Sequence, residues 1–263
     1  MLRGSITNIG TTILTANRLV GDFVLFLRDS LVSVFKRPLL ARQNWDQMVN
    51  IGVNSMIIAN LTALFVGMVM VLQTGYQLQQ FGAKLYSAGI TAIALAREMI
   101  PVFTAMVVGS RVSASIAAEL GSMKITEQID AMWTLSVSPF KYLIAPRIIA
   151  STLMLPVITV YANIVGFLGG MLVGTVLLNM TPRIYYNYTM KFLLLQDVST
   201  GLIKTVFFGL IIGVVGCFFG YRTEGGAAGV GRSTTSAVVT TLVLILIFDY
   251  LLSSWIMFFT GQM

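Results

Sequence analysis

The chain has 263 residues, of which 56% are apolar and only 10% are charged, and its mean hydropathy is +0.85. Because a soluble domain carries about 25% charged residues, this composition excludes a soluble globular protein and indicates an integral membrane protein. The net charge of +7 would suggest nucleic acid as the partner of a soluble protein. Here we interpret it as loops beside anionic lipid, with no nucleic-acid site.

The residue types present restrict the chemistry. The chain has no His and a single Cys, Cys217, which lies in an apolar run. A disulfide within the chain, a zinc site of the Cys/His type and a His-based triad are therefore excluded. We expect neither catalytic residues nor a metal site.

The first 48 residues are too charged to cross a bilayer. Between Val20 and Val34, however, apolar residues recur at helical spacing. We predict that residues 1–48 form a cytoplasmic segment whose helix lies in the membrane interface. A helix packed on the membrane domain as an anchor is the alternative interpretation, and the two are compatible.

Residues 49–263 are predicted to form an all-α membrane domain with five transmembrane helices. A helix that crosses ~30 Å of hydrocarbon needs about 20 mainly apolar residues, and five stretches meet this need: 53–72, 86–110, 148–178, 200–221 and 237–259. The third stretch contains two consecutive G-x-x-x-G steps, at Gly166, Gly170 and Gly174. These steps allow close helix approach, either at a dimer face or inside the bundle.

The basic residues of the loops predict the orientation. With the N-terminus inside, twelve Lys and Arg residues, among them Arg3, Lys36 and Arg37, fall on cytoplasmic segments. Only Lys84, Arg183 and Lys191 fall outside. Since cytoplasmic loops carry the excess of Lys and Arg, we predict a cytoplasmic N-terminus and a C-terminus on the opposite side.

The loop between the second and third spans predicts a docking element. At 100° per residue, Glu119, Glu127 and Asp130 fall within about 80° of one another. This pattern predicts a short amphipathic helix with an acidic edge over about residues 117–133, suited to a groove on a partner. A helix lying flat on the membrane is the alternative, but its acidic edge would meet an anionic leaflet.

Four charged residues interrupt the spans, namely Arg97, Glu98, Lys204 and Asp249. Because a charge at the bilayer centre costs ~2.5 to 3.5 kcal/mol on insertion scales, we expect all four to face the bundle interior or a wet cavity. Counted in from the ends of their spans, Arg97 and Asp249 both lie near mid-depth in the bilayer, so we predict a structural pair between them. Glu98 and Lys204 are predicted on the cavity side, with Lys204 near the outer end of its span. In the alternative, all four merely lock the bundle together.

Residues 226–233 read GAAGVGRS, which fits the spacing of a P-loop with Arg232 in place of Lys. A P-loop follows a strand and opens a helix of an α/β domain, whereas this segment joins two predicted spans. We therefore predict a glycine turn before a helix that begins near Ser233, and no nucleotide site.

Three separated motifs stand out in the chain. They are ALAREMIPV at 94–102, GSRVSASIAAELGSMKITEQIDAM with SPFKYLIAPRIIA between 109 and 150, and GYRTEGGAAGVGRSTTSAVV at 220–239. Together and in this order they resemble the MlaE/YrbE family of ABC-transporter permeases. The resemblance covers the chain from about Asn50 onward. It implies a homodimer in the bacterial inner membrane, with a periplasmic C-terminus and two cytoplasmic ATPase subunits. It also implies an MCE-domain protein on the periplasmic side and phospholipid as cargo, in maintenance of outer-membrane lipid asymmetry.

The resemblance also implies roles for individual residues. Residues 118–132 would be the coupling helix that meets the ATPase, through Glu119, Lys124, Glu127 and Asp130. The substrate cavity would be lined by Arg97, Glu98, Lys204 and Asp249. The chain would have no ATPase site or cofactor of its own, since ATP is bound by the partner subunit. A passive channel or scaffold subunit remains an alternative, as does an intramembrane enzyme, although Asp249 lacks a second matched Asp.

Overall fold

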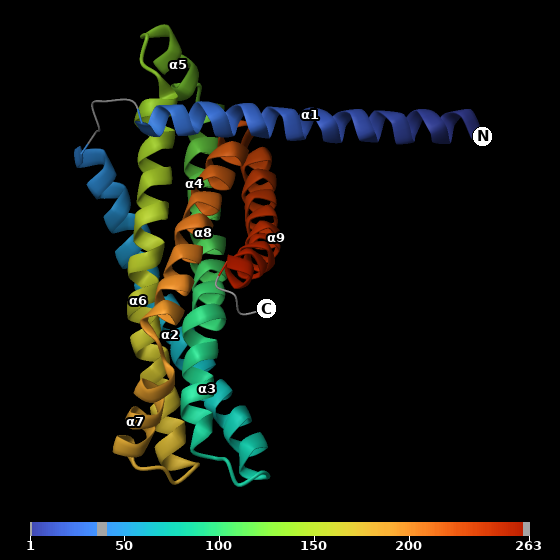
Figure 1. The fold of residues 1–263 in the computed structure, drawn as a ribbon. Coiled ribbons are helices and arrows are strands. Elements are labelled where there is room, and N and C mark those ends of the chain that lie inside the picture. The colour runs from blue at the N-terminus through green and yellow to red at the C-terminus, as the bar shows by residue number, and fades with distance from the viewer. Residues whose placement is uncertain (1, 36–40, 260–263) are drawn as a thin grey trace.

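The computed structural model describes residues 2–35 and 41–259, with the side chains of residues 17–18, 20–35 and 41–258. Every regular element in this part of the chain is helical (Figure 1). In chain order the elements are α1 (Leu2–Phe35), α2 (Ala41–Gln79), α3 (Tyr86–Ala94), η1 (Leu95–Met99), α4 (Ile100–Ile125), α5 (Gln128–Thr134), η2 (Phe140–Ile144), α6 (Ala145–Val176), α7 (Pro182–Phe192), α8 (Leu195–Tyr221) and α9 (Gly226–Phe259). The elements η1 and η2 are short π-helices.

Five segments of the described chain are long and apolar enough to cross a membrane. They are α2, the continuous run from α3 through η1 to α4, the run from η2 through α6, α8 and α9. The predicted all-α membrane protein with five spans is therefore confirmed. The helices extend beyond the predicted apolar stretches, as α2 does at Ala41–Gln79, because backbone hydrogen bonding continues outside the hydrocarbon.

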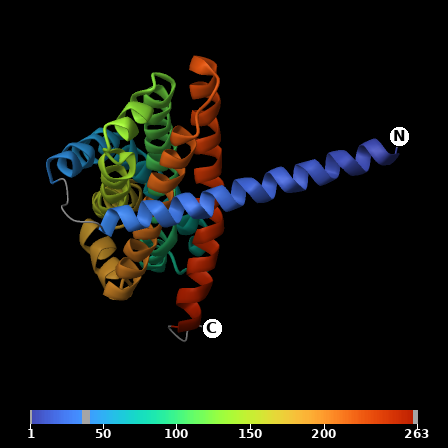
Figure 2. The same cartoon turned by 90° about the horizontal axis from the view of Figure 1, so that it is seen from above.

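The spans form a bundle, and α1 lies across one end of it (Figure 1). From above, α1 reaches well beyond the bundle, and α9 runs obliquely to the other spans (Figure 2). Helix α5 projects at the same end as α1, whereas α7 and the turn between α2 and α3 lie at the opposite end (Figure 1). We call these the α5 end and the α7 end.

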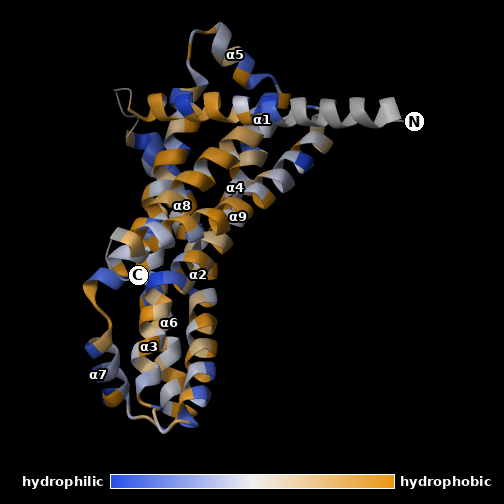
Figure 3. Ribbon diagram, turned by 45° about the vertical axis from the view of Figure 1, so that its right-hand side comes forward, coloured by the Kyte–Doolittle hydropathy of each residue, from blue (hydrophilic) through white to orange (hydrophobic). Residues whose placement is uncertain are grey.

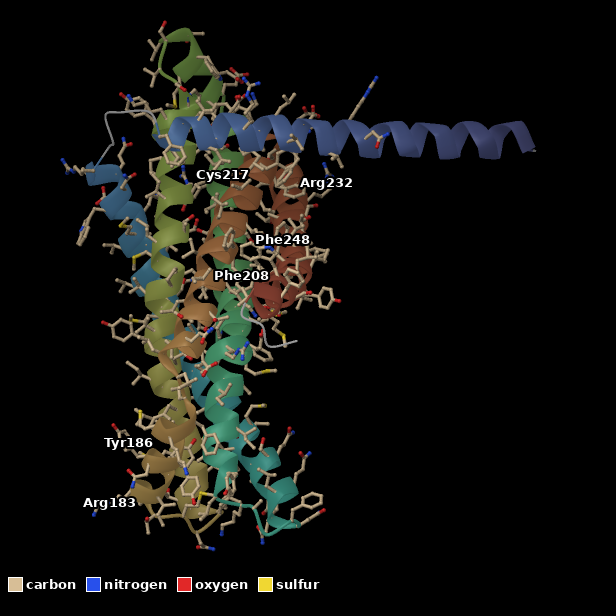
Figure 4. The ribbon with its side chains drawn as sticks, in the orientation of Figure 1. Arg183, Tyr186, Phe208, Cys217, Arg232 and Phe248 are labelled. Atoms are coloured by element: carbon tan, nitrogen blue, oxygen red, sulfur yellow. The ribbon has the colours of Figure 1, made fainter. Side chains whose placement is uncertain are left out.

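The two ends differ in their basic residues. Apolar residues dominate the spans, whereas many hydrophilic residues lie toward the ends (Figure 3). Lys84 lies in the α2–α3 turn and Arg183 and Lys191 lie in α7, so all three residues predicted outside share the α7 end. Figure 4 shows Arg183 and Tyr186 there, with Cys217 and Arg232 toward the α5 end.

The charge count thus predicts a cytoplasmic α5 end, and this orientation stays a prediction. Two of the residues it uses, Lys36 and Arg37, lie outside the described residues, as does the side chain of Arg3.

Helix α1 is attached to the bundle through contacts with α6, η2 and α8. The Phe26 ring packs against Phe218 and Tyr221, with ring centroids 5.5 and 6.0 Å apart. Asp22 accepts a hydrogen bond from Arg222 at 2.6 Å. Other apolar side chains of α1 are exposed, namely Val20, Val24, Leu25 and Val32. The helix therefore has both the packing of an anchor and the exposed apolar surface of an interfacial helix.

Glycines bring α2 and α6 into backbone contact. A Cβ added at Gly67 would overlap the carbonyl oxygen of Gly166. At Gly170 and Gly174, an added Cβ would lie 2.6 and 2.8 Å from atoms of Tyr185 in α7. The two G-x-x-x-G steps therefore make contacts inside the chain, which decides between the alternatives that the sequence leaves open.

Each π-helix immediately precedes a helix with proline at its second position. The Ile100 N–H bonds to the Leu95 carbonyl and the Ala145 N–H to the Phe140 carbonyl, in each case five residues back. The next residues are Pro101 and Pro146, each of which lacks an N–H and in a regular α-helix would clash with the carbonyl four residues earlier. The widened turn accommodates the proline ring, and in η1 it also sets the directions of Arg97 and Glu98.

The glycine segment before the last span differs from the prediction. Helix α9 begins at Gly226, so residues 226–233 form its first turns instead of a turn that precedes it. The chain reverses at Gly225 and Gly226, whose φ angles of 87° and 68° lie in the left-handed region that favours glycine.

The backbone contact between α2 and α6 predicts that Gly67→Ala destabilises the protein. The added methyl group has to displace a backbone carbonyl, and overpacking of this kind costs roughly 1–3 kcal/mol. The matched control is Gly231→Ala in α9, where nothing lies within 4 Å of an added Cβ. We expect Gly67→Ala to lower the melting temperature of the detergent-solubilised protein and Gly231→Ala not to lower it. Equal melting temperatures for the two variants would contradict the contact.

Candidate functional site

Lys204 of α8 lies at the centre of a polar cluster within the spans. Its side chain is completely buried, and its ammonium donates to Glu98 Oε2, to Asp249 Oδ1 at 3.2 Å and to Ser253 Oγ at 2.6 Å. Glu98 belongs to η1, whereas Asp249 and Ser253 belong to α9. We call these four residues the Lys204 cluster.

The cluster satisfies the full hydrogen-bonding capacity of the ammonium. Lysine has three N–H donors, and Lys204 has three acceptors from two neighbouring elements. The Ser253 hydroxyl also lies 2.7 Å from the Asp249 carbonyl oxygen and 3.3 Å from both carboxylate oxygens of Glu98. Burying a charge is costly unless it is paired and hydrogen-bonded, so these contacts explain how Lys204 is tolerated in a span.

Arg97 has a different partner from the one predicted. Its guanidinium lies 3.6 Å from Asp197 Oδ1 in the first turn of α8. Asp197 also accepts a hydrogen bond from the Leu194 N–H at 3.0 Å, which caps α8. The predicted pair of Arg97 with Asp249 is therefore wrong, because Asp249 is directed from α9 toward Lys204. Sequence depth alone does not give the direction in which a side chain leaves its helix.

The predicted exposure of Lys204 is also wrong. An ammonium near the outer end of a span was expected to reach toward water, but Lys204 has no exposed surface. The prediction of Glu98 on a cavity side stays a prediction, although its side chain is 36% exposed and that of Asp249 is 22% exposed. Two carboxylates thus surround one ammonium, and both retain surface that is open to the outside of this single chain.

The predicted coupling helix is interrupted. Helix α4 runs on to Ile125, and Glu127 then adopts a left-handed φ of 59° before α5 begins at Gln128. Because the turn breaks the 100° periodicity, Glu119, Glu127 and Asp130 do not form the edge of one helix. This corrects the single helix predicted over about residues 117–133.

The four charged residues assigned to coupling have separate surroundings. Glu119 accepts a hydrogen bond from Arg147 of α6 at 2.9 Å, so it belongs to the bundle. Lys124 donates to Asp130 at 2.8 Å and ties the end of α4 to α5. Glu127 is exposed, and no ion pair joins it to another described residue. Of the predicted acids, Glu127 and Asp130 therefore remain at the projecting α5.

Helix α5 is connected to the rest of the α5 end by an aromatic contact. Trp133 Nε1 donates to the Tyr221 hydroxyl at 3.3 Å, and Tyr221 packs against Phe26 of α1 and Phe140 of η2. Tyr221 therefore connects α5 with α1, η2 and α8.

Asp197 and Ser253 belong to these polar contacts but were missed in the sequence. A signal for Asp197 was present, since an acidic residue in the first turn of a helix is favoured by the helix dipole. Ser253 follows Asp249 by four residues, which places both on one face of a helix. A serine in an apolar span has many structural explanations, so its spacing alone does not identify it.

The cluster predicts that Lys204→Gln strongly destabilises the protein. Without the ammonium, Glu98 and Asp249 have no cation between them, and breaking a buried pair costs ~3–5 kcal/mol. Lys191→Gln is the control, because Lys191 is exposed in α7. Thermal unfolding in detergent should show a large loss for Lys204→Gln only. A melting temperature as high as that of Lys191→Gln would be incompatible with the buried cluster.

Comparisons with known proteins agree with the membrane fold. The family described as permease MlaE matches residues 44–255. A probable ABC transporter permease protein of Rickettsia typhi is 42% identical over 234 residues, which cover 89% of this chain and 90% of that protein. A probable ABC transporter permease protein of Synechocystis is 44% identical over 217 residues, 82% of each chain.

A plant protein is also similar. The chloroplastic protein trigalactosyldiacylglycerol 1 of Arabidopsis thaliana is 38% identical over 228 residues, which cover 87% of this chain and 65% of that protein. The family match includes parts of all five spans, and the bacterial relatives each match most of the chain. This chain therefore belongs to the MlaE family of ABC-transporter permeases.

Proposed function

We propose that the chain is the membrane subunit of an ATP-driven phospholipid transporter, and that two copies enclose the lipid. In this proposal it lies in the bacterial inner membrane, with a cytoplasmic α5 end and a periplasmic C-terminus. Partner ATPase subunits bind and hydrolyse ATP, so this chain needs no cofactor. A periplasmic MCE-domain protein exchanges lipid with it, which serves outer-membrane lipid asymmetry.

The observation that carries the proposal is the exposure of Glu98 and Asp249 within the spans. A carboxylate facing hydrocarbon is costly, so such residues face a bundle interior or a wet cavity. In a single chain these two remain partly open. A second copy that covers this side would convert the exposed charges into the polar part of a shared, water-containing cavity.

The packing of α9 supports a partner on the same side. In α9, 17% of the apolar 18-residue stretch is buried inside the chain, whereas 61% of the corresponding stretch of α8 is buried. Asp249 and Ser253 belong to α9, so the helix that carries half of the Lys204 cluster also has the largest unburied share of the spans. Apolar walls beside a few charges fit a molecule with acyl chains and a polar headgroup.

The relatives support the ATPase and the lipid. Two of them are named as ABC transporter permeases, and a permease of this kind requires an ATPase partner. The Arabidopsis relative is named after a diacylglycerol lipid, which supports a lipid as cargo. The passive channel, the main alternative, requires neither ATP nor a partner, so ion conductance by the isolated chain would favour it.

Lipid transfer should depend on the Glu98 carboxylate. Glu98→Gln leaves Lys204 paired with Asp249, so we expect the protein to accumulate normally. We expect ATP-dependent transfer of a fluorescent phospholipid from proteoliposomes to acceptor vesicles to fall about tenfold, the value of one hydrogen bond to a charged group. Glu224→Gln, an exposed acid in the α8–α9 turn, is the control. Normal transfer by Glu98→Gln would contradict the cavity assignment.

Binding of the ATPase should depend on Glu127. Charge complementarity contributes to docking, and Glu127 is exposed beside α5, so Glu127→Lys should weaken capture of the ATPase subunit in a pull-down. The matched control is Asp29→Lys, which makes the same reversal at an exposed site of α1. Equal capture by both variants would show that docking does not use Glu127.

A further inference from the structure

A polar pocket lies between α2 and α4 at the α5 end, and none of the residues that line it belongs to the Lys204 cluster. Its volume is about 200 Å³. The residues that line it include Gln47, Asn50 and Asn54 from α2 and Arg111 from α4. These side chains supply hydrogen-bond donors around one cationic group.

Arg111 lacks an anionic partner among the described residues. Its one hydrogen bond is to Ser55 Oγ at 3.5 Å, which is at the long limit for such a bond. Glu119 also lines the pocket, but its carboxylate is bonded to Arg147 at 2.9 Å. The pocket therefore contains one uncompensated positive charge, and arginine is well suited to bind a phosphate through two N–H groups.

The pocket lies at the depth of lipid headgroups. Asn50 precedes the apolar stretch 53–72 of α2, and Arg111 follows the apolar stretch 86–110. Both stretches match the length of the hydrocarbon. The two sides of the pocket therefore meet where a span leaves the hydrocarbon, which is where the phosphates of one leaflet lie.

The surface of α2 next to the pocket changes from polar to apolar along the helix, as a phospholipid does from its headgroup to its acyl chains. Gln47, Asn50 and Asn54 continue at helical spacing into Ile57 and Leu61, on one face of the helix. Ile57 is 81% exposed and Leu61 is 52% exposed. One face thus offers polar groups at headgroup depth and apolar groups along the path of an acyl chain.

We propose that this pocket binds the phosphate of a phospholipid from the leaflet at the α5 end, with Arg111 as the principal ligand. The Asn50 and Asn54 amides donate further hydrogen bonds, and an acyl chain lies along Ile57 and Leu61. The site is separate from the Lys204 cluster, and it does not require the transported cargo to be a phospholipid. It selects lipids that carry a phosphate over lipids that lack one.

The test measures lipid binding to the purified full chain by native mass spectrometry. The probes are phosphatidylglycerol and a diacylglycerol with the same acyl chains, which lacks the phosphate. We expect Arg111→Gln to weaken phosphatidylglycerol binding about tenfold, as for loss of a hydrogen bond to a charged group, with no effect on diacylglycerol. Arg42→Gln is the matched control, because Arg42 is exposed on α2 at the same end but does not line the pocket.

A second variant keeps the test decisive if Arg111→Gln does not fold. Asn54→Asp changes an exposed side chain and places a negative charge in the pocket, so it should abolish the preference for phosphatidylglycerol. Equal phosphatidylglycerol binding by wild type and both variants would overturn the proposal. Binding of inorganic phosphate at Arg111 without binding of phosphatidylglycerol would also overturn it, because the site would then take a free anion and not a lipid.

Discussion

Lys204 is enclosed by protein within an apolar bundle, where burying an ammonium is costly unless it is paired and hydrogen-bonded. The acceptors come from η1 and α9, so the charge fixes the position of α8 relative to both elements. If α9 moved away, Lys204 would lose the Asp249 and Ser253 contacts at 3.2 and 2.6 Å. The arrangement of the spans around Lys204 is therefore specified by charge as well as by apolar packing.

Close helix packing makes this arrangement possible. A Cβ at Gly201 of α8 would overlap the carbonyl oxygen of Ala96 in η1, and a Cβ at Gly209 would lie 2.5 Å from the Ser151 carbonyl oxygen. Because glycine has no side chain, α8 approaches η1 and α6 at backbone distance. Lys204 lies between these two glycines in sequence. The short distance between α8 and η1 therefore brings its ammonium within reach of Glu98. Pro101 contributes as well, since the π-helix before it sets the direction of Glu98.

Much of the fold was predictable because its signals are local. Five apolar stretches of sufficient length predict five spans, and the apolar spacing from Val20 to Val34 predicts α1. The pairing of charges was not predictable in the same way. Arg97 pairs with Asp197 and Asp249 with Lys204 because of the directions in which side chains leave their helices. Those directions depend on the π-helix at η1 and on packing between distant segments.

The prediction of a single helix over about residues 117–133 is wrong for a different reason. A helical projection assumes that one helix continues, and a single left-handed residue, Glu127 with φ 59°, ends that continuity. Because Glu127 is not glycine, the residue type does not predict the left-handed conformation at this turn. Glu119 consequently belongs to the bundle through Arg147, whereas Glu127 and Asp130 accompany the projecting helix. The structure places Glu127 and Asp130 at the projecting α5, and their part in binding an ATPase stays a prediction.

The most direct test of the account is a pair of double-mutant cycles on Lys204, measured by thermal unfolding of the detergent-solubilised protein. One cycle combines Lys204→Met with Asp249→Asn, and the other combines Lys204→Met with Asp197→Asn. Residues in one ion-pair network couple by about 0.5–3 kcal/mol, whereas separate sites are nearly additive. The account predicts coupling in the first cycle and additivity in the second. Additivity between Lys204 and Asp249 would contradict the buried cluster on which the proposed site depends.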